Sequence, residues 1–151
     1  MTHHIAQVNV GRILGPMDGE VMAEFQRALD PINLLAERTP GFVWRLQDGD
    51  DATSLRPFED DTVLVNMSVW ESVEALRDYT YQSGHTHYVK RRKEWFQNFG
   101  RPHYALWWVP AGHHPTPLEA GERLDALHAD GPTSRAFTFT KLFDPPALED
   151  V

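Results

Sequence analysis

Short segments of alternating apolar and polar residues recur along this chain, with helical patterns between them, and their order constrains the fold more than any other feature. Period-two alternation is typical of half-buried strands, whereas apolar residues spaced by three or four positions are typical of amphipathic helices. The alternating segments predict strands over residues 4–12, 42–47, 63–70, 103–109 and 136–143.

Helical patterns separate these strands. The first follows the opening strand, and Pro31 is expected to kink or break it because proline lacks a backbone N–H and clashes with the preceding turn. The second covers residues 71–81, and a helical pattern resumes over residues 85–98. A third helix is predicted to start at Thr116, because Pro117 and Glu119 complete a capping box with proline at the first helical position.

The order of these elements is β-α-β-β-α-β, followed by one more helix and strand. That order predicts an α+β fold, a ferredoxin-like split βαβ antiparallel sheet with helices on one face, plus a C-terminal α-β extension. The length of 151 residues is typical of one domain. We expect this domain to cover residues 1–143 and to end in a flexible tail over residues 144–151.

The composition excludes several classes of function. With 22 acidic and 14 basic residues the formal net charge is −8, so neither nucleic acid nor an anionic membrane is expected as a partner. The chain has no cysteine, which excludes disulfides, cysteine-ligated zinc and thiol nucleophiles. No signal peptide and no membrane-spanning apolar run are visible, so a soluble cytoplasmic protein is expected.

The segment from Tyr79 to Phe96 holds the densest set of chemically capable side chains. On a helix, His85, Tyr88 and Arg92 fall on one face with Trp95 beside them. Such a row could hold an anionic or phenolic ligand and transfer a proton. The alternative is an amphipathic helix whose charged groups are simply solvated.

The pair His85 and His87 suggests a metal site, but residues two apart on a helix point about 200° apart. No bound metal is therefore predicted. A haem held by one histidine stays open as an alternative cofactor.

Polar residues also interrupt the apolar strands. Asn9, Asn66 and Ser68 lie on strand faces that either meet solvent or a partner, or line a cavity where their side chains would orient a carbonyl or dioxygen. Trp107 and Trp108 must point to opposite faces of their strand, so at most one of them lines any given cavity.

Several blocks of sequence resemble the bacterial family known as domain of unknown function 3291. The blocks are residues 68–76, Ser83-Gly84-His85, residues 91–96, residues 106–113, residues 119–124 and residues 131–139. This family is in turn similar to the antibiotic biosynthesis monooxygenase-like superfamily of dimeric α/β barrels, through Trp70 at a strand end and the helix that follows.

The resemblance implies a homodimer of ferredoxin-like subunits. The superfamily includes cofactor-independent oxygenases, haem-degrading enzymes, polyketide cyclases and proteins without known chemistry. Haem degraders pair a strand asparagine with a helix tryptophan and histidine. Asn9 and His85 match two of these roles, while Tyr79 stands roughly where the tryptophan would be.

The leading hypothesis is a small-molecule enzyme, a cofactor-independent monooxygenase or acid-base cyclase or isomerase, acting on an aromatic or polyketide-like substrate. His85 would transfer the proton, Arg92 would pair with a phenolate or enolate oxygen, and Tyr88 would assist them. The predicted substrate-binding residues are Asn9, Trp44, Asn66, Trp70, Tyr79, Trp95 and Trp107. The alternatives are a haem-binding or haem-processing protein and a non-catalytic ligand-binding or assembly module.

Overall fold

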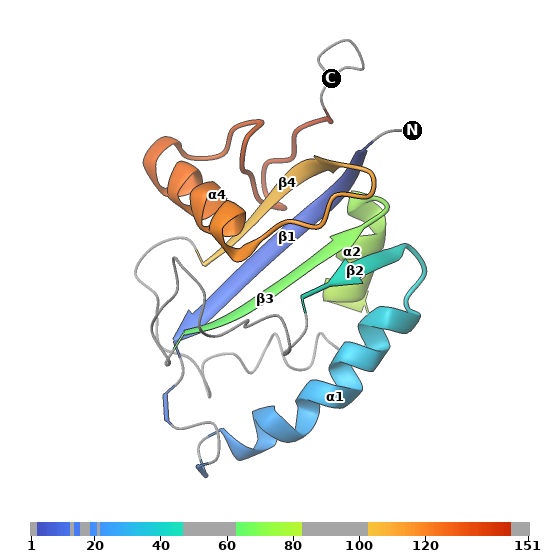
Figure 1. Cartoon of the computed structure of the whole chain (residues 1–151), viewed down its shortest axis with the longest axis vertical. Coiled ribbons are helices and arrows are strands. Elements are labelled where there is room, and N and C mark those ends of the chain that lie inside the picture. Colours follow the sequence, from blue (N-terminus) through green and yellow to red (C-terminus); the bar gives the residue numbers. More distant parts are fainter. Residues whose placement is uncertain are drawn as a thin grey trace.

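The computed structural model describes residues 3–12, 14–15, 19–20, 22–46, 63–82 and 103–145. Its elements follow the predicted order (Figure 1). They are β1 (His3–Arg12), α1 (Ala23–Arg38), β2 (Phe42–Arg45), β3 (Val63–Trp70), α2 (Val73–Gln82), β4 (Tyr104–Pro110) and α4 (Pro117–Asp130).

The four strands form one antiparallel sheet in the order β2-β3-β1-β4. The two strands that start and end the β-α-β-β-α-β unit, β1 and β4, are therefore neighbours, and β3 lies on the other side of β1. This is the strand order of the split βαβ arrangement. The predicted ferredoxin-like α+β fold is confirmed.

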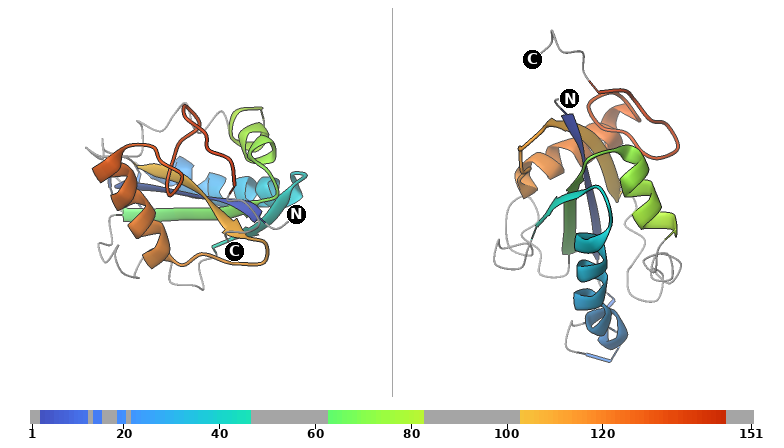
Figure 2. Two further views of the ribbon diagram at one scale, coloured as in Figure 1. Left: turned by 90° about the horizontal axis from the view of Figure 1, so that it is seen from above. Right: turned by 90° about the vertical axis from the view of Figure 1, so that its right-hand side faces the viewer.

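Helices cover both faces of this sheet. Alternate residues of β1 and β4, among them Val8 and Trp107, pack with Leu124 of α4 on one face. Residues of the opposite parity, among them Ile5, pack on the other face with Ala36 of α1. Figure 2 shows α4 on one side of the sheet, with α2 and the segment after α4 on the other. The helices of the βαβ unit thus share a face, and the appended helix covers the reverse.

The expected break at Pro31 is wrong, because α1 is one uninterrupted helix of 16 residues with this proline inside it. Pro31 is exposed. Proline removes one backbone N–H donor from the helix, and the tertiary contacts at the end of α1 compensate for that lost hydrogen bond. Ala36, near that end, is buried against Trp70 and Leu76.

Gly41 joins α1 to β2 in a conformation that requires glycine. Its φ is +92°, in the left-handed region. A Cβ atom at this position would overlap the side chain of Ala75 in α2. The absence of a side chain therefore lets the α1–β2 turn lie directly against α2.

The start of α4 agrees with the predicted capping box, since Thr116 Oγ1 accepts a hydrogen bond from the Glu119 backbone N–H at 3.1 Å. The predicted strand over residues 136–143 is wrong in extent. Only Phe137 pairs with β4, in an antiparallel bridge to Leu106. Two turns, closed by bridges from Thr133 to Ala136 and from Thr138 to Lys141, curl the chain away on both sides of Phe137.

The predicted helix over residues 85–98, residues 47–62 between β2 and β3, and the last residues of the expected tail lie outside the described residues. Among the helices that the structure does describe, none combines the length and apolar character needed to cross a membrane.

Candidate ligand-binding site

Four polar side chains form a continuous row across β1 and β3, on the sheet face that α1 and α2 share. The register places Asn9 opposite Asn66 and Gln7 opposite Ser68. Residues two apart on a strand point to the same face, so both cross-strand pairs project together. We call Gln7, Asn9, Asn66 and Ser68 the amide ladder.

Gln7 is the centre of the amide ladder. Its Nε2 donates to Asn66 Oδ1 at 2.9 Å and to Ser68 Oγ at 2.8 Å, while its Oε1 accepts from Asn9 Nδ2 at 3.4 Å. Asn9 Nδ2 also lies 3.3 Å from Asn66 Oδ1. Both cross-strand pairs are therefore linked into one network, in which Gln7 contacts the three other residues.

Burial decreases along the amide ladder from Gln7 and Ser68 to Asn66. Gln7 and Ser68 are 8 % and 7 % exposed, Asn9 is half-buried, and Asn66 is exposed. A buried polar group needs a hydrogen-bond partner, and loss of that partner lowers the free energy of unfolding by about 1–3 kcal/mol. Gln7 and Ser68 therefore hold the row in place, and the amide of Asn66 is the part that an incoming molecule can reach.

Three aromatic rings continue the row at its buried end. Trp70 is fully buried, donates from Nε1 to Ser68 Oγ at 2.8 Å, and stacks on Tyr79 with ring centroids 5.1 Å apart. Phe42 meets Trp70 edge-on with centroids 5.5 Å apart. We call Phe42, Trp70 and Tyr79 the aromatic stack. A buried aromatic cluster thus adjoins one end of a set of oriented polar groups.

Tyr79 remains a neutral phenol in this environment. Burial raises the pKa of its hydroxyl well above the ordinary value of 10.0, against the smaller opposing effect of the Arg45 charge. Its hydroxyl donates to the backbone oxygen of Ile32 in α1 at 3.4 Å. Tyr79 therefore contributes a ring to the aromatic stack and a neutral hydrogen-bonding group, not a phenolate.

The structure brings together four of the predicted substrate-binding residues: Asn9, Asn66, Trp70 and Tyr79. Trp44 and Trp107 lie on the opposite face. Trp107 is fully buried beneath α4, and Trp44 stacks on His114 with centroids 4.8 Å apart. As predicted, Trp107 and Trp108 point to different faces, since Trp108 belongs to the cluster around Trp70.

The predicted catalytic residues His85, Tyr88 and Arg92, together with Trp95, lie outside the described residues. Their assignment stays a prediction. The helix that precedes them in the sequence, α2, ends at Gln82 and packs on the same side of the sheet as the amide ladder.

Gln7, at the centre of the amide ladder, is not among the predicted site residues, and Ser68 is predicted as a polar strand residue but not as substrate-binding. A signal for Gln7 is present in the sequence, since Gln7 lies two positions from Asn9 on the same strand face. What the sequence does not carry is the register that places Gln7 against Ser68.

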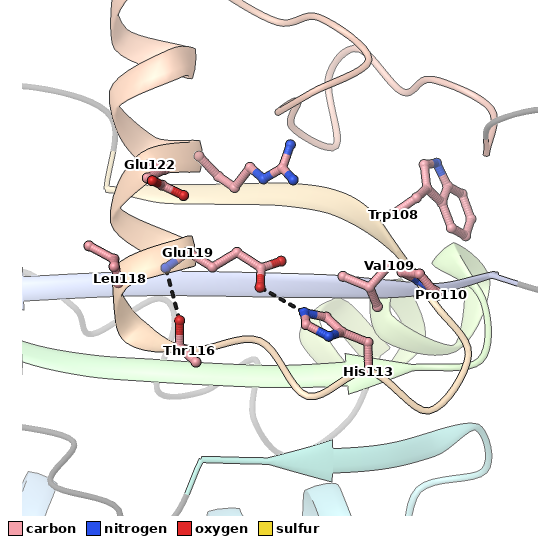
Figure 3. Close-up of a pocket in the computed structure, with 9 residues that line it drawn as sticks. Trp108, Val109, Pro110, His113, Thr116, Leu118, Glu119 and Glu122 are labelled. Atoms are coloured by element: carbon pink, nitrogen blue, oxygen red, sulfur yellow. Dashed lines mark hydrogen bonds and ion pairs between the residues drawn. The ribbon is translucent and has the colours of Figure 1, made fainter. Parts of the chain in front are cut away.

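A second polar group lies between β4 and α4, beside a pocket of about 460 Å³ (Figure 3). Glu119 Oε1 pairs with His113 Nε2 at 2.7 Å, and Glu119 Oε2 accepts from Trp107 Nε1 at 2.9 Å. Glu119 therefore satisfies an indole N–H that is buried in the core. The structural role of this carboxylate accounts for its position.

Within the described residues, no three histidine, aspartate or glutamate side chains are arranged to hold an ion, and His85 and His87 lie outside these residues.

Comparison with known proteins places the chain in a family. Fold and site together define an α+β protein with a row of polar and aromatic side chains on the sheet face that α2 covers. The chain belongs to the family described as domain of unknown function (DUF3291), whose model matches residues 4–151. The predicted family is confirmed. No curated protein matches the chain.

Three solved structures illustrate which known proteins have a similar fold. SnoaB, a cofactor-independent oxygenase from Streptomyces nogalater, is 20 % identical, with 78 % of this chain and 99 % of that chain covered and a TM-score of 0.48. NE2512, a protein of unknown function from Nitrosomonas europaea, is 11 % identical, with 78 % and 96 % covered and a TM-score of 0.49. The ActVA-Orf6 monooxygenase from Streptomyces coelicolor, in complex with Nanaomycin D, is 16 % identical, with 76 % and 92 % covered and a TM-score of 0.45. Similarity at this level assigns neither substrate nor reaction.

Proposed function

We propose that this protein is a small-molecule enzyme that acts on an aromatic or polyketide-like substrate, by cofactor-independent oxygenation or by acid-base rearrangement. The observation that carries the proposal is a hydrogen-bonded row of polar side chains that runs from the exposed amide of Asn66 to the buried aromatic stack. Oriented amide groups at the exposed end of such a row suit a substrate that carries oxygen on a ring system.

The roles follow from the chemistry of each group. In this proposal the amide ladder binds the reacting oxygen, and the aromatic stack fixes the buried end of the ladder. His85 removes or returns a proton, Arg92 pairs with the oxygen as it becomes negative, and Tyr88 and Trp95 complete the wall. Trp44 and Trp107 are left out, since they occupy the opposite face of the sheet.

Oxygenation in such a site balances without an added electron donor. When an anthrone becomes an anthraquinone, its CH₂ group loses two hydrogens and gains one oxygen atom. The second atom of O₂ leaves as water with those hydrogens, and the substrate supplies all the electrons. The protein needs to remove a proton from the CH₂ group and stabilise the resulting enolate oxygen, which are the tasks given to His85 and to the amide ladder with Arg92.

Dithranol, an anthrone, is a suitable probe, with oxygen uptake by the full chain as the measurement. We expect Asn66→Ala to lower kcat/KM at least about tenfold, and His85→Ala and Arg92→Ala about a hundredfold, typical of lost oxyanion donors and proton-transfer groups. His128→Ala and Arg27→Ala, exposed residues on α4 and α1, are the matched controls and should not change the rate.

Unchanged kcat/KM in all three site variants would contradict the site. Binding of dithranol without oxygen uptake above the uncatalysed rate would contradict oxygenation of this substrate and favour acid-base chemistry or ligand binding. The expected homodimer stays a prediction, which light scattering of the full chain tests.

A further inference from the structure

The amide ladder has a second hydrogen-bonded arrangement built into it. The oxygen and nitrogen of a side-chain amide are nearly equal in size, so rotating an amide by 180° exchanges a donor for an acceptor without moving any other atom. The distances within the ladder are 2.8–3.4 Å, and each suits either direction of donation.

In the arrangement described above, Asn66 Oδ1 receives N–H groups from Gln7 and Asn9. Its Nδ2 is then the atom turned away from the ladder, and it can donate to an approaching ligand. Ser68 Oγ accepts two N–H groups here, from Gln7 and from Trp70.

In the rotated arrangement all three amides turn together. Asn66 Nδ2 then donates to Gln7 Oε1 and Asn9 Oδ1, Gln7 Nε2 donates to Asn9 Oδ1, and the hydroxyl of Ser68 donates to Gln7 Oε1. The Trp70 indole, which can only donate, keeps its bond to Ser68 Oγ in both cases. Asn66 now presents Oδ1, which accepts from a ligand.

Rotation of one amide alone is unfavourable. If only Asn66 turned, its Nδ2 would face the nitrogens of Gln7 and Asn9 at 2.9 Å and 3.3 Å, donor against donor. Gln7 is bonded to all three other members and is nearly fully buried, so no water replaces a lost partner there. The ladder therefore changes direction as a unit.

We infer that the amide ladder is a coupled relay, with Gln7 as its positioning residue, that lets Asn66 bind an oxygen either as a carbonyl or as a hydroxyl group. The inference rests on the proposed function and narrows its substrate class. The ligand is an aromatic molecule whose oxygen alternates between keto and enol, or between quinone and phenol, at one position. The relay follows that change without moving the ligand.

Three bicyclic ligands of similar size test the relay on the isotope-labelled full chain. Tetralin offers no hydrogen bond, α-tetralone offers only an acceptor, and α-naphthylamine acts chiefly as a donor. We expect α-tetralone and α-naphthylamine each to bind about fivefold tighter than tetralin, as one added hydrogen bond implies. The side-chain amide signals of Gln7, which the ligand does not touch, should shift in opposite directions for the two.

Asn66→Asp fixes the polarity of the ladder's exposed end, because a carboxylate only accepts. In this variant α-naphthylamine should keep its advantage over tetralin, whereas α-tetralone should lose its own and no longer shift the Gln7 signals. Asn33→Asp makes the same chemical change on α1 and should leave both advantages intact.

Shifts of the Gln7 signals in the same direction for both ligands, or an advantage for only one of them in the unmodified protein, would overturn the relay. Equal binding of all three ligands would also overturn it, while leaving the proposed aromatic site in place. If none of the three binds, the proposed function and the relay are both wrong.

Discussion

At the scale of single residues, Trp70 joins the two halves of the candidate site. Its ring forms the middle of the aromatic stack, and its N–H bonds to Ser68 in the amide ladder. Because Trp70 is fully buried, both its apolar area and its one polar atom must be satisfied within the protein. The contacts of Trp70 with Ser68, Phe42 and Tyr79 therefore hold the buried end of the site in place.

Tyr79 gives the residue-scale prediction, which concerns pH. Its folded-state pKa is raised, so below the unfolded-state value near 10 both states are protonated and Tyr79 adds no pH dependence. Above that value the unfolded state loses the proton first, and stability falls as pH rises. We expect Tyr79→Phe to remove this part of the alkaline decrease, while lowering stability at neutral pH by about 1 kcal/mol.

Urea unfolding at neutral pH and above pH 10 (about the ordinary value) measures the effect, and tyrosinate absorbance gives the titration directly. Tyr104→Phe is the matched control. An equal alkaline decrease in the unmodified protein and in Tyr79→Phe would show that Tyr79 ionises normally in the folded state.

At the scale of elements, the contact between the α1–β2 turn and α2 sets where the aromatic stack forms. Gly41 lies against Ala75, and its carbonyl oxygen accepts from the backbone N–H of Glu71 just before α2. Phe42 follows Gly41 directly, so this contact holds Phe42 against the edge of Trp70. A single close approach thus aligns β2, β3 and α2.

Gly41→Ala tests that contact. The new methyl group would overlap Ala75 and occupy a positive φ, so we expect a loss of about 2–4 kcal/mol in the free energy of unfolding. Gly112→Ala is the matched control, since Gly112 has a φ of +93° but no atom within 4 Å of the added Cβ. It should cost about 1 kcal/mol, the conformational part alone.

Chemical denaturation of both variants separates the two effects. Equal losses for the two would mean that the contact with Ala75 adjusts without cost and that only backbone conformation matters.

At the scale of the whole molecule, the sheet lies between α4 on one side and α2 on the other (Figure 2). The bond from Trp107 Nε1 to Glu119 crosses from sheet to helix on the α4 side. It holds α4, which lies outside the βαβ unit, against the sheet. The amide ladder is on the other face of the same strands, so the core beneath α4 packs against the opposite side of the strands that carry the ladder.

Glu119→Ala should therefore lower the free energy of unfolding by about 1–3 kcal/mol, since it leaves the buried indole N–H of Trp107 unpaired. Glu119→Gln keeps an acceptor oxygen and should recover most of the loss. Glu122→Ala removes an exposed carboxylate one turn along the same helix and should change stability by less than about 0.5 kcal/mol. Thermal unfolding compares the three, and equal effects at the two positions would contradict the anchoring role of Glu119.

The sequence by itself determined the order of the elements and the sidedness of each strand. Alternation predicted that Asn9 and Val8 lie on opposite faces of β1, and the capping box predicted Thr116 at the start of α4. Both signals depend only on the geometry of a few neighbouring residues. The break predicted at Pro31 is wrong because a proline affects helix geometry only locally, whereas contacts with other parts of the fold stabilise α1.

Only the tertiary structure decided the partners. Asn9 and Asn66 are 57 positions apart, and their meeting depends on the register of β1 with β3, which no local pattern contains. The same holds for Trp107, whose indole partner depends on the face that α4 covers. Periodicity states that a residue faces inward. Strand order and helix placement, set by the burial of the whole chain, determine what it meets there.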